Sequence, residues 1–224
     1  SALRGRAVHE IGEEGIGGMA AVAADEEATR EALGAEGIAA HVANLNAPRQ
    51  TIIGGPDEAI EAALERLPER GLAIRRVAVS APFHTPVLEE ASRSLGEHLV
   101  RMDMRGPAFP VYSNVSAAPY PSDVPAIRAN LEEHLAHRVR FVEQIRAMHE
   151  DGVRVFLEVG PGRILSGLVR RILADAPHAA IPLDASGQSS WVPLAHLLAH
   201  VHALGLPVDP AAWFERRALP TAGL

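Results

Sequence analysis

Short apolar runs and amphipathic stretches alternate along residues 16–81. The run IGGMAAVAA ends at Asp25, a residue type that caps helix N-termini, and a helix is expected from there to about Gly34. The turn-rich segment NLNAPR separates two short strands, and GGPDEAIEAALERLPERG has the pattern of a capped helix that stops at Gly71. Strands are predicted at residues 16–24, 38–43, 50–53 and 72–79. This β-α-β-β-α-β order is that of a ferredoxin-like unit, with two helices on one face of a four-stranded antiparallel sheet.

Longer helices and more continuous apolar strands follow from residue 82 onward. Three strands are predicted there, and the segment VRVFLEV is the most apolar of them. The predicted strands are residues 109–115, 153–159 and 178–183, and the predicted helices are residues 85–102, 127–136, 139–150, part of 160–175, and 192–203. The alternation of strands and helices indicates an α/β fold. Three strands make a thin sheet for so many helices, so part of the sheet is expected from elsewhere.

The segment VSAPFHTPVLEE places a histidine between a predicted strand and a predicted helix. The apolar residues before Pro82 alternate as in a short, largely buried strand. Thr85 is suited to be the N-cap of the next helix, and Pro86 has the fixed φ that the first helical position favours. His84 is therefore expected to be held between two rigid elements.

Composition excludes several classes of function. The chain has 224 residues, 47% of them hydrophobic, which is enough for a substantial core. Its net charge of −7 and 4% aromatic content argue against nucleic acid as a partner. Charged residues interrupt every apolar stretch within about a dozen residues, so no membrane span is expected. With no cysteine the chain can form neither disulfides nor thiolate metal sites, and we expect it in the cytoplasm.

Several motifs resemble one known family. VSAPFHT resembles the histidine motif of malonyl-CoA:acyl-carrier-protein transacylases and of the acyltransferase domains of polyketide synthases. Other stretches agree with that family in order and spacing: ALRGRAVHE with GIGGMAAV, NAPRQTIIGG, FPVYSNV, LEEHLAHRVRF and FLEVGPGRILSGL. The resemblance runs from about Leu3 to Leu173, and several motifs in the same order are far more specific than any one of them.

The resemblance implies a fold, a reaction and partners. The fold is α/β, with a partial α/β-hydrolase-like large subdomain (residues 1–15 and 82–205) and an inserted ferredoxin-like α+β small subdomain (residues 16–81). Residues 206–224 resemble a linker of multidomain synthases. The reaction is transfer of a malonyl group from malonyl-CoA to the phosphopantetheine thiol of an acyl carrier protein, with no permanently bound cofactor. The partners are the acyl carrier protein, other synthase domains and the upstream half of the same acyltransferase domain.

Four residues carry roles by this resemblance. His84 is the base that activates a serine, and the backbone carbonyl of His134 orients its imidazole. Arg4 binds the free carboxylate of the malonyl group, because a guanidinium offers a bidentate fork and a fixed charge. Phe83 leaves little room for a branch methyl beside the acyl α-carbon and so favours malonyl over methylmalonyl groups. Read without the resemblance, Arg4 is a solvated charge and Phe83 is a packing residue.

The family's nucleophilic serine lies in a GHSxG segment upstream of the motif at Arg4, and no serine in this chain has that pattern. Ser80 lies in the motif VSAPFHT and Ser166 lies in FLEVGPGRILSGL, but neither has the sequence of such a turn. Three explanations stay open: the chain is the C-terminal piece of an acyltransferase, it is an inactive docking module for an acyl carrier protein, or another polypeptide supplies the serine. We favour the first, in which the chain alone is inactive. In a docking module, the basic cluster Arg70, Arg75 and Arg76 would face the acidic carrier.

Two further patterns bear on ligand binding. The turn GPG at residues 160–162 precedes a helix but lacks the spacing of a nucleotide-binding loop. His196 and His200 lie four residues apart on a predicted helix, yet no acidic third ligand accompanies them. We therefore expect neither a nucleotide site nor a metal site.

Overall fold

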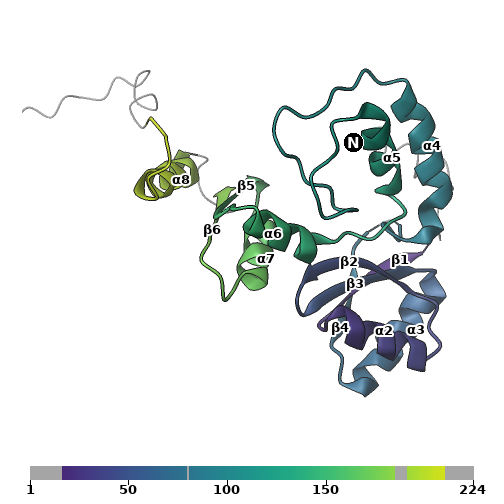
Figure 1. Ribbon diagram of the computed structural model, residues 1–224. Coiled ribbons are helices and arrows are strands. Elements are labelled where there is room, and N and C mark those ends of the chain that lie inside the picture. Colours follow the sequence, from purple (N-terminus) through teal and green to yellow (C-terminus); the bar gives the residue numbers. More distant parts are fainter. Residues whose placement is uncertain (1–16, 80, 185–190, 210–224) are drawn as a thin grey trace, which may run out of the picture. The chain divides into compact units, whose positions relative to one another are not determined.

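The computed structural model describes residues 17–79, 81–184 and 191–209 (Figure 1). It divides the chain into two compact units, Ser1–Val153 and Arg154–Leu224. Across the described residues, the chain is an α/β protein that contains no helix long and apolar enough to cross a bilayer.

A four-stranded antiparallel sheet organises the first unit. Its strands are β1 (Gly18–Val22), β2 (His41–Ala47), β3 (Gln50–Gly55) and β4 (Ile74–Val77), in the spatial order β2-β3-β1-β4. Helix α2 (Glu26–Ala35) follows β1, and helix α3 (Asp57–Arg66) with a short 3₁₀ turn (Leu67–Arg70) follows β3. Both helices lie on the same face of the sheet (Figure 1). The predicted order of strands and helices in this region is confirmed.

The two faces of this sheet bury different clusters, because successive side chains of a strand point to opposite sides. Ala20 and Val22 of β1 belong to the core that α2 and α3 cover. Met19 and Ala21 belong to a second cluster with Ala43 and Ile52 on the opposite face. All five residues of β1 are buried, since both faces of this central strand are covered.

Helix ends in this unit follow the local sequence. The side chain of Asp25 accepts a hydrogen bond from the backbone N–H of Ala28 at the start of α2, as predicted. Gly71 ends the turn after α3 with a φ of 77°, a left-handed conformation that glycine adopts at little cost.

The segment NLNAPR differs from its prediction as a turn. Strand β2 continues to Ala47, and only Pro48 and Arg49 form the turn to β3. The pairing of β2 with β3 shifts register between Val42 and Asn44 and again before Ala47. Such bulges let a strand continue through residues that favour turns.

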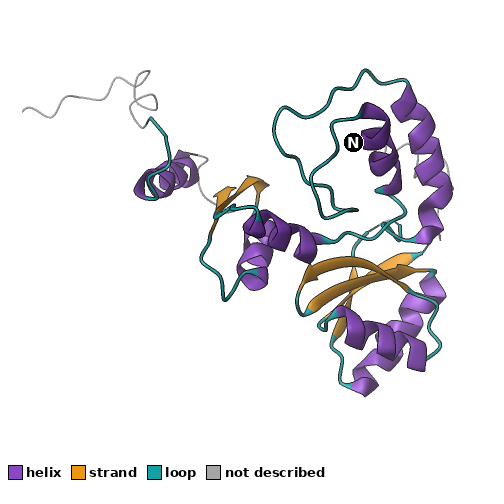
Figure 2. Ribbon diagram, in the orientation of Figure 1, coloured by secondary structure: helices purple, strands orange, loops and turns teal. Residues whose placement is uncertain are grey.

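The rest of the first unit is helical, with long loops (Figure 2). A 3₁₀ turn (Pro86–Leu88) leads into α4 (Glu89–Val100), followed by α5 (Val124–Glu133) and α6 (Phe141–Glu150). Residues 109–115 were predicted as a strand, and this is wrong: only an isolated bridge joins Tyr112 to Pro119. Phe109 is 73% exposed and Val111 is 38% exposed, so the apolar side chains of this run are not buried as those of a core strand would be.

In the second unit, a parallel pair of strands packs with two helices. These elements are β5 (Val155–Pro161), α7 (Ile164–Ile172), β6 (Ala179–Asp184) and α8 (Trp191–Ala203), all close to their predicted positions. Both helices contact β6, and α7 also contacts β5. A parallel pair joined by a helix is the unit from which α/β sheets are built.

Candidate active site

His84 lies in the loop between β4 and the 3₁₀ turn at Pro86, and its backbone is strained. Its φ of 63° is in the left-handed region, which is uncommon for a residue with a side chain. The backbone N–H of His84 donates to the carbonyl oxygen of Leu135 at 2.8 Å, which helps to hold this conformation. Strain of this kind persists only where the surrounding structure enforces it, and it is frequent at functional sites.

The imidazole of His84 is oriented by a backbone carbonyl. Its Nδ1 lies 2.7 Å from the carbonyl oxygen of His134, fifty positions further along the chain. A carbonyl oxygen can only accept a hydrogen bond, so Nδ1 must carry the proton and Nε2 the lone pair in the neutral ring. A histidine in this tautomer can accept a proton at Nε2.

The segment that supplies this carbonyl is anchored to the sheet. His134 directly follows α5, and a few residues later Val139 forms a parallel bridge with Asn44 of β2. The N–H of Val139 donates to Ala43 at 2.8 Å, and its carbonyl accepts from Leu45 at 2.9 Å. This pairing explains why α6 begins at Phe141 rather than at residue 139 as predicted. The sheet thus positions both His84, which follows β4, and the carbonyl that faces it.

An ion pair adds a second link between that segment and the first half of the unit. Arg138 pairs with the carboxylate of Glu26 at the start of α2, and Arg30 pairs with the same carboxylate. Burial raises the pKa of Glu26, but the two arginines lower it by more, so its pKa lies below the ordinary value. These side chains are about one-third exposed or more, so the pairs contribute modestly to stability.

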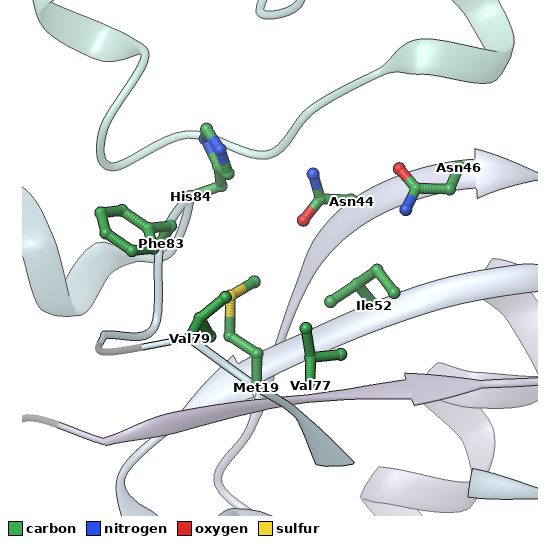
Figure 3. A pocket seen from close by; sticks show the side chains of 8 residues that line it. All are labelled: Met19, Asn44, Asn46, Ile52, Val77, Val79, Phe83 and His84. Atoms are coloured by element: carbon green, nitrogen blue, oxygen red, sulfur yellow. The ribbon is translucent and has the colours of Figure 1, made fainter. Parts of the chain in front are cut away.

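A pocket of about 410 Å³ opens beside His84 (Figure 3). Its apolar floor is formed by side chains of the sheet, and its polar groups are the imidazole and two amides from β2. The lining residues are Met19, Asn44, Asn46, Ile52, Val77, Val79, Phe83 and His84. Apolar walls with a few converging polar groups are typical of small-molecule sites.

Phe83 both lines the pocket and packs in the core. Its ring contacts the cluster of Met19 and Ile52 beneath the pocket, and also the cluster that joins α4 to α5. The two readings of this residue, packing and pocket wall, are therefore compatible.

Asn44 and Asn46 are pocket residues that the sequence reasoning missed. Both lie in the segment predicted as a turn, so their side chains were given no role. The sequence does contain a sign of a strand here: the polar residues Asn44 and Asn46 alternate with the apolar residue Leu45, which is buried.

Only some of the other predicted residues are described by the structure. Arg4 and Ser80 are outside the described residues. Ser166 is buried at the start of α7 in the second unit, where its hydroxyl donates to the carbonyl of Arg163. Arg70 and Arg76 of the predicted docking cluster are both paired with carboxylates. These counter-charges weaken the cluster as an attractor for an acidic partner.

The GPG segment spans the last two residues of β5 and the first residue of the connection to α7. Before it, the carboxylate of Glu158 accepts from the backbone N–H groups of Leu165 at 2.9 Å and Ser166 at 2.8 Å, at the N-terminus of α7. This protein carboxylate occupies the helix end at which an anion would otherwise bind. Within the described ranges, no group of three or more His, Asp or Glu side chains is arranged to hold a metal ion.

Comparison with known proteins gives consistent matches. The chain is 37% identical over 179 residues to the malonyl CoA-acyl carrier protein transacylase of Bacillus subtilis (strain 168), covering 75% of this chain and 55% of the relative. It is 38% identical over 160 residues to the polyketide biosynthesis protein ThaF of Burkholderia thailandensis, covering 70% of this chain and 14% of that protein.

Solved structures agree with these relatives. The acyltransferase domain from the second module of the salinomycin polyketide synthase matches with a TM-score of 0.86 and 26% identity, covering 100% of this chain and 52% of that one. The malonyl-CoA:acyl carrier protein transacylase of Xanthomonas oryzae matches with a TM-score of 0.79 and 32% identity, covering 88% of this chain and 62% of that one. The chain thus spans little more than half the length of its full-length transacylase relatives. A family model described as "Acyl transferase domain" matches residues 1–187, so this protein belongs to the acyl transferase domain family.

Proposed function

We propose that this chain is the histidine-bearing part of a malonyl-type acyltransferase, with the nucleophilic serine on a segment that the chain does not contain. The observation that carries the proposal is the imidazole of His84, oriented by the His134 carbonyl at 2.7 Å beside a pocket. The family match by itself supports the general reaction, acyl transfer, and assigns no role to a particular residue.

In this mechanism, His84 takes up and returns one proton in each of two half-reactions. Nε2 takes the proton of the serine hydroxyl as its oxygen attacks the thioester carbonyl of malonyl-CoA. The imidazolium then returns the proton to the departing coenzyme A thiolate. In the second half-reaction, the phosphopantetheine thiol of an acyl carrier protein gives its proton to Nε2 and attacks the acyl-serine ester, whose serine oxygen regains the proton. The His134 carbonyl keeps Nδ1 protonated throughout.

The substrate contacts follow from the site residues. Arg4 pairs with the malonyl carboxylate, and Phe83 restricts the space beside the α-carbon. The apolar floor and the amides of Asn44 and Asn46 suit the pantetheine arm, which has both methyl groups and amides. No permanently bound cofactor is required.

The proposed enzyme has two subdomains. Residues 16–81 form the ferredoxin-like subdomain, which the strand order β2-β3-β1-β4 supports. Residues 1–15 and 82–205 belong to a partial hydrolase-like subdomain, and residues 206–224 are linker-like. The assembled enzyme works in the cytoplasm with an acyl carrier protein and other synthase domains.

The experiment combines this chain with the missing half, taken from a complete family member, and measures malonyl transfer from malonyl-CoA to a carrier protein. We expect transfer by the combination and none by the chain alone. His84→Ala should lower the rate by about 10²–10⁴-fold, the usual contribution of general base catalysis. His137→Ala, a change at an exposed histidine three residues beyond His134, is the matched control. Carrier binding without transfer by any combination would contradict the proposal and favour a docking module.

Arg4 is tested in the same assay by its choice of acyl group. Arg4→Ala should lower malonyl transfer and raise the ratio of acetyl to malonyl transfer, because the carboxylate loses its bidentate partner. Arg6→Ala is the control two residues away. An unchanged ratio in Arg4→Ala would remove Arg4 from the site.

A further inference from the structure

Gly54 of β3 lies directly beneath the loop that carries His84. A Cβ atom at this position would lie 2.9 Å from Cγ2 of Thr85, a contact shorter than real side chains make. The same atom would lie 3.5 Å from Pro82 Cβ and 3.5 Å from Met19 Cγ, which are ordinary distances. Thr85 is therefore the neighbour that excludes a side chain at residue 54, because the next nearest atoms leave room for a Cβ.

Thr85 closes the loop around His84. Its hydroxyl donates to the carbonyl oxygen of Pro82 at 2.6 Å, so the two residues that flank Phe83 and His84 are joined. Both Thr85 and Pro82 are fully buried, and neither lines the pocket. Thr85 was expected to cap the next helix, but its side chain makes no capping bond there and bonds backward to Pro82 instead.

These contacts surround a residue in a strained conformation. His84 has a φ of 63°, and in this conformation its Nδ1 lies 2.7 Å from the carbonyl oxygen of His134. The His134 and Leu135 carbonyls hold the loop from one side. On the sheet side, Thr85 lies close to Gly54 of β3, and within the loop the Thr85–Pro82 hydrogen bond joins its two ends.

We propose that Gly54 and Thr85 are positioning residues, which hold the imidazole of His84 against the His134 carbonyl. Thr85 acts by closing the Pro82–Thr85 turn, and Gly54 acts by leaving room for the Thr85 methyl group. This inference rests on the proposed function for its catalytic consequence, but not for its structural content. A misplacement of about 1 Å at a catalytic group can cost about 10²-fold in rate, so small shifts of this loop matter.

The structural content is tested on the 224-residue chain with ¹⁵N-labelled histidine. Long-range ¹H–¹⁵N spectra distinguish a protonated ring nitrogen from one that carries a lone pair, and His84→Gln identifies the signals of His84. We expect the Nδ1-protonated tautomer in the parent chain. Thr85→Val keeps the methyl group but removes the hydrogen bond to Pro82, and Gly54→Ala introduces the clash. Both should shift His84 toward the Nε2-protonated tautomer that free imidazole prefers.

A double variant provides the rescue. Thr85→Ser keeps the hydroxyl and removes Cγ2, the atom that the new methyl group of Gly54→Ala would strike. Gly54→Ala combined with Thr85→Ser should therefore return His84 to the Nδ1-protonated tautomer. Gly55→Ala is the matched control, because its methyl group would approach Ala39 and Ala40 at 3.2 Å, away from the His84 loop. It should lower the melting temperature without changing the tautomer.

The catalytic consequence is tested with the completed enzyme. Thr85→Val and Gly54→Ala should each lower kcat by about 10–100-fold with little change in KM for malonyl-CoA. Unchanged His84 signals in both folded variants, or a tautomer change in Gly55→Ala of the same size, would overturn the inference. If the parent enzyme transfers no malonyl group, the proposed function fails, while the tautomer measurement still decides whether these residues position His84. If one variant does not fold, the other and the double variant carry the test.

Discussion

At the scale of single residues, the site depends on backbone groups as much as on side chains. His84 is held by two carbonyls from the segment after α5, and the space beneath its loop exists because residue 54 has no side chain. Side-chain substitutions at residues 134 and 135 do not remove these carbonyls. Conservative substitutions around the loop should therefore affect the site mainly by shifting the position of His84.

Phe83 gives a prediction about acyl choice. Phe83→Ser should raise the ratio of methylmalonyl to malonyl transfer by about 10-fold in the completed enzyme, because removing the ring makes room for a branch methyl. The same change should lower the free energy of unfolding by about 2 kcal/mol, since half-buried packing with Met19 and Ile52 is lost.

Competition assays with the two acyl-CoA substrates measure the ratio, and urea unfolding measures the stability. Phe109→Ser is the control, because Phe109 is 73% exposed and in another loop. A loss of stability with an unchanged ratio would leave Phe83 with a packing role alone.

At the scale of elements, carboxylates of one element bind the backbone or side chains of another. Glu158 of β5 occupies the N-terminus of α7, and Glu26 of α2 binds Arg138 in the segment that carries the His134 carbonyl. The turn between β2 and β3 shortens to two residues, because β2 continues by pairing with Val139 on its other side. Tertiary pairing thus overrides the local preference of an Asn-rich segment.

Glu158 gives a prediction about pH. Burial raises its pKa, but the N–H groups of Ser166 and Leu165 lower it by more, so the folded pKa lies below the ordinary value of 4.5. A depressed carboxylate pKa stabilises the fold above the unfolded value, and the stabilisation is lost as pH falls through the folded value. Glu158→Gln should therefore destabilise the second unit by about 1 kcal/mol near neutral pH, as for other helix caps.

The difference between Glu158→Gln and the parent chain should shrink as the pH is lowered below 4.5 and through the folded pKa. Urea unfolding followed by tryptophan fluorescence reports on this unit, because Trp191 and Trp213 both fall within residues 154–224. Asp175→Asn, at an exposed position of the same unit, is the control. A difference that stays constant with pH would contradict this account of the cap.

At the scale of the whole molecule, the second unit exposes apolar side chains around its parallel strands. Val159 is 79% exposed and Ile164 is 75% exposed, and Leu157 and Leu165 are each about half exposed. Across the described residues, β5 pairs with β6 alone, so its other edge has no strand beside it. Exposed apolar residues next to an open strand edge are typical of a surface that another part of a protein covers.

Under the proposed function, the occupant expected on this surface is the serine-bearing half of the acyltransferase domain; this chain spans 55% of the transacylase from Bacillus subtilis. Val159→Lys should reduce both the association of the two halves and malonyl transfer by at least 10-fold, because a charge would be buried without a partner. Val100→Lys is the control, because Val100 is 66% exposed at the end of α4 in the first unit. Co-purification of the two halves and the transfer assay measure the outcome, and equal effects of the two changes would contradict a specific interface.

The sequence by itself determined most of the elements and their order. Alternating apolar residues, the cap at Asp25 and the stop at Gly71 act over a few residues, so the local sequence is sufficient to predict them. The motif around His84 also pointed to the loop between a strand and a helix. One exception was the apolar run at residues 109–115, because a strand requires a partner that the local sequence does not specify.

Only the tertiary structure decided what surrounds His84. Nothing in the chemistry of residue 134 distinguishes its carbonyl from any other, and only the resemblance to a family singled it out in advance. The amides of Asn44 and Asn46, the bridge at Val139 and the close approach of Gly54 to Thr85 were not predicted. All of these contacts join positions far apart in the chain, and they depend on how strands and loops pack rather than on local residue preference.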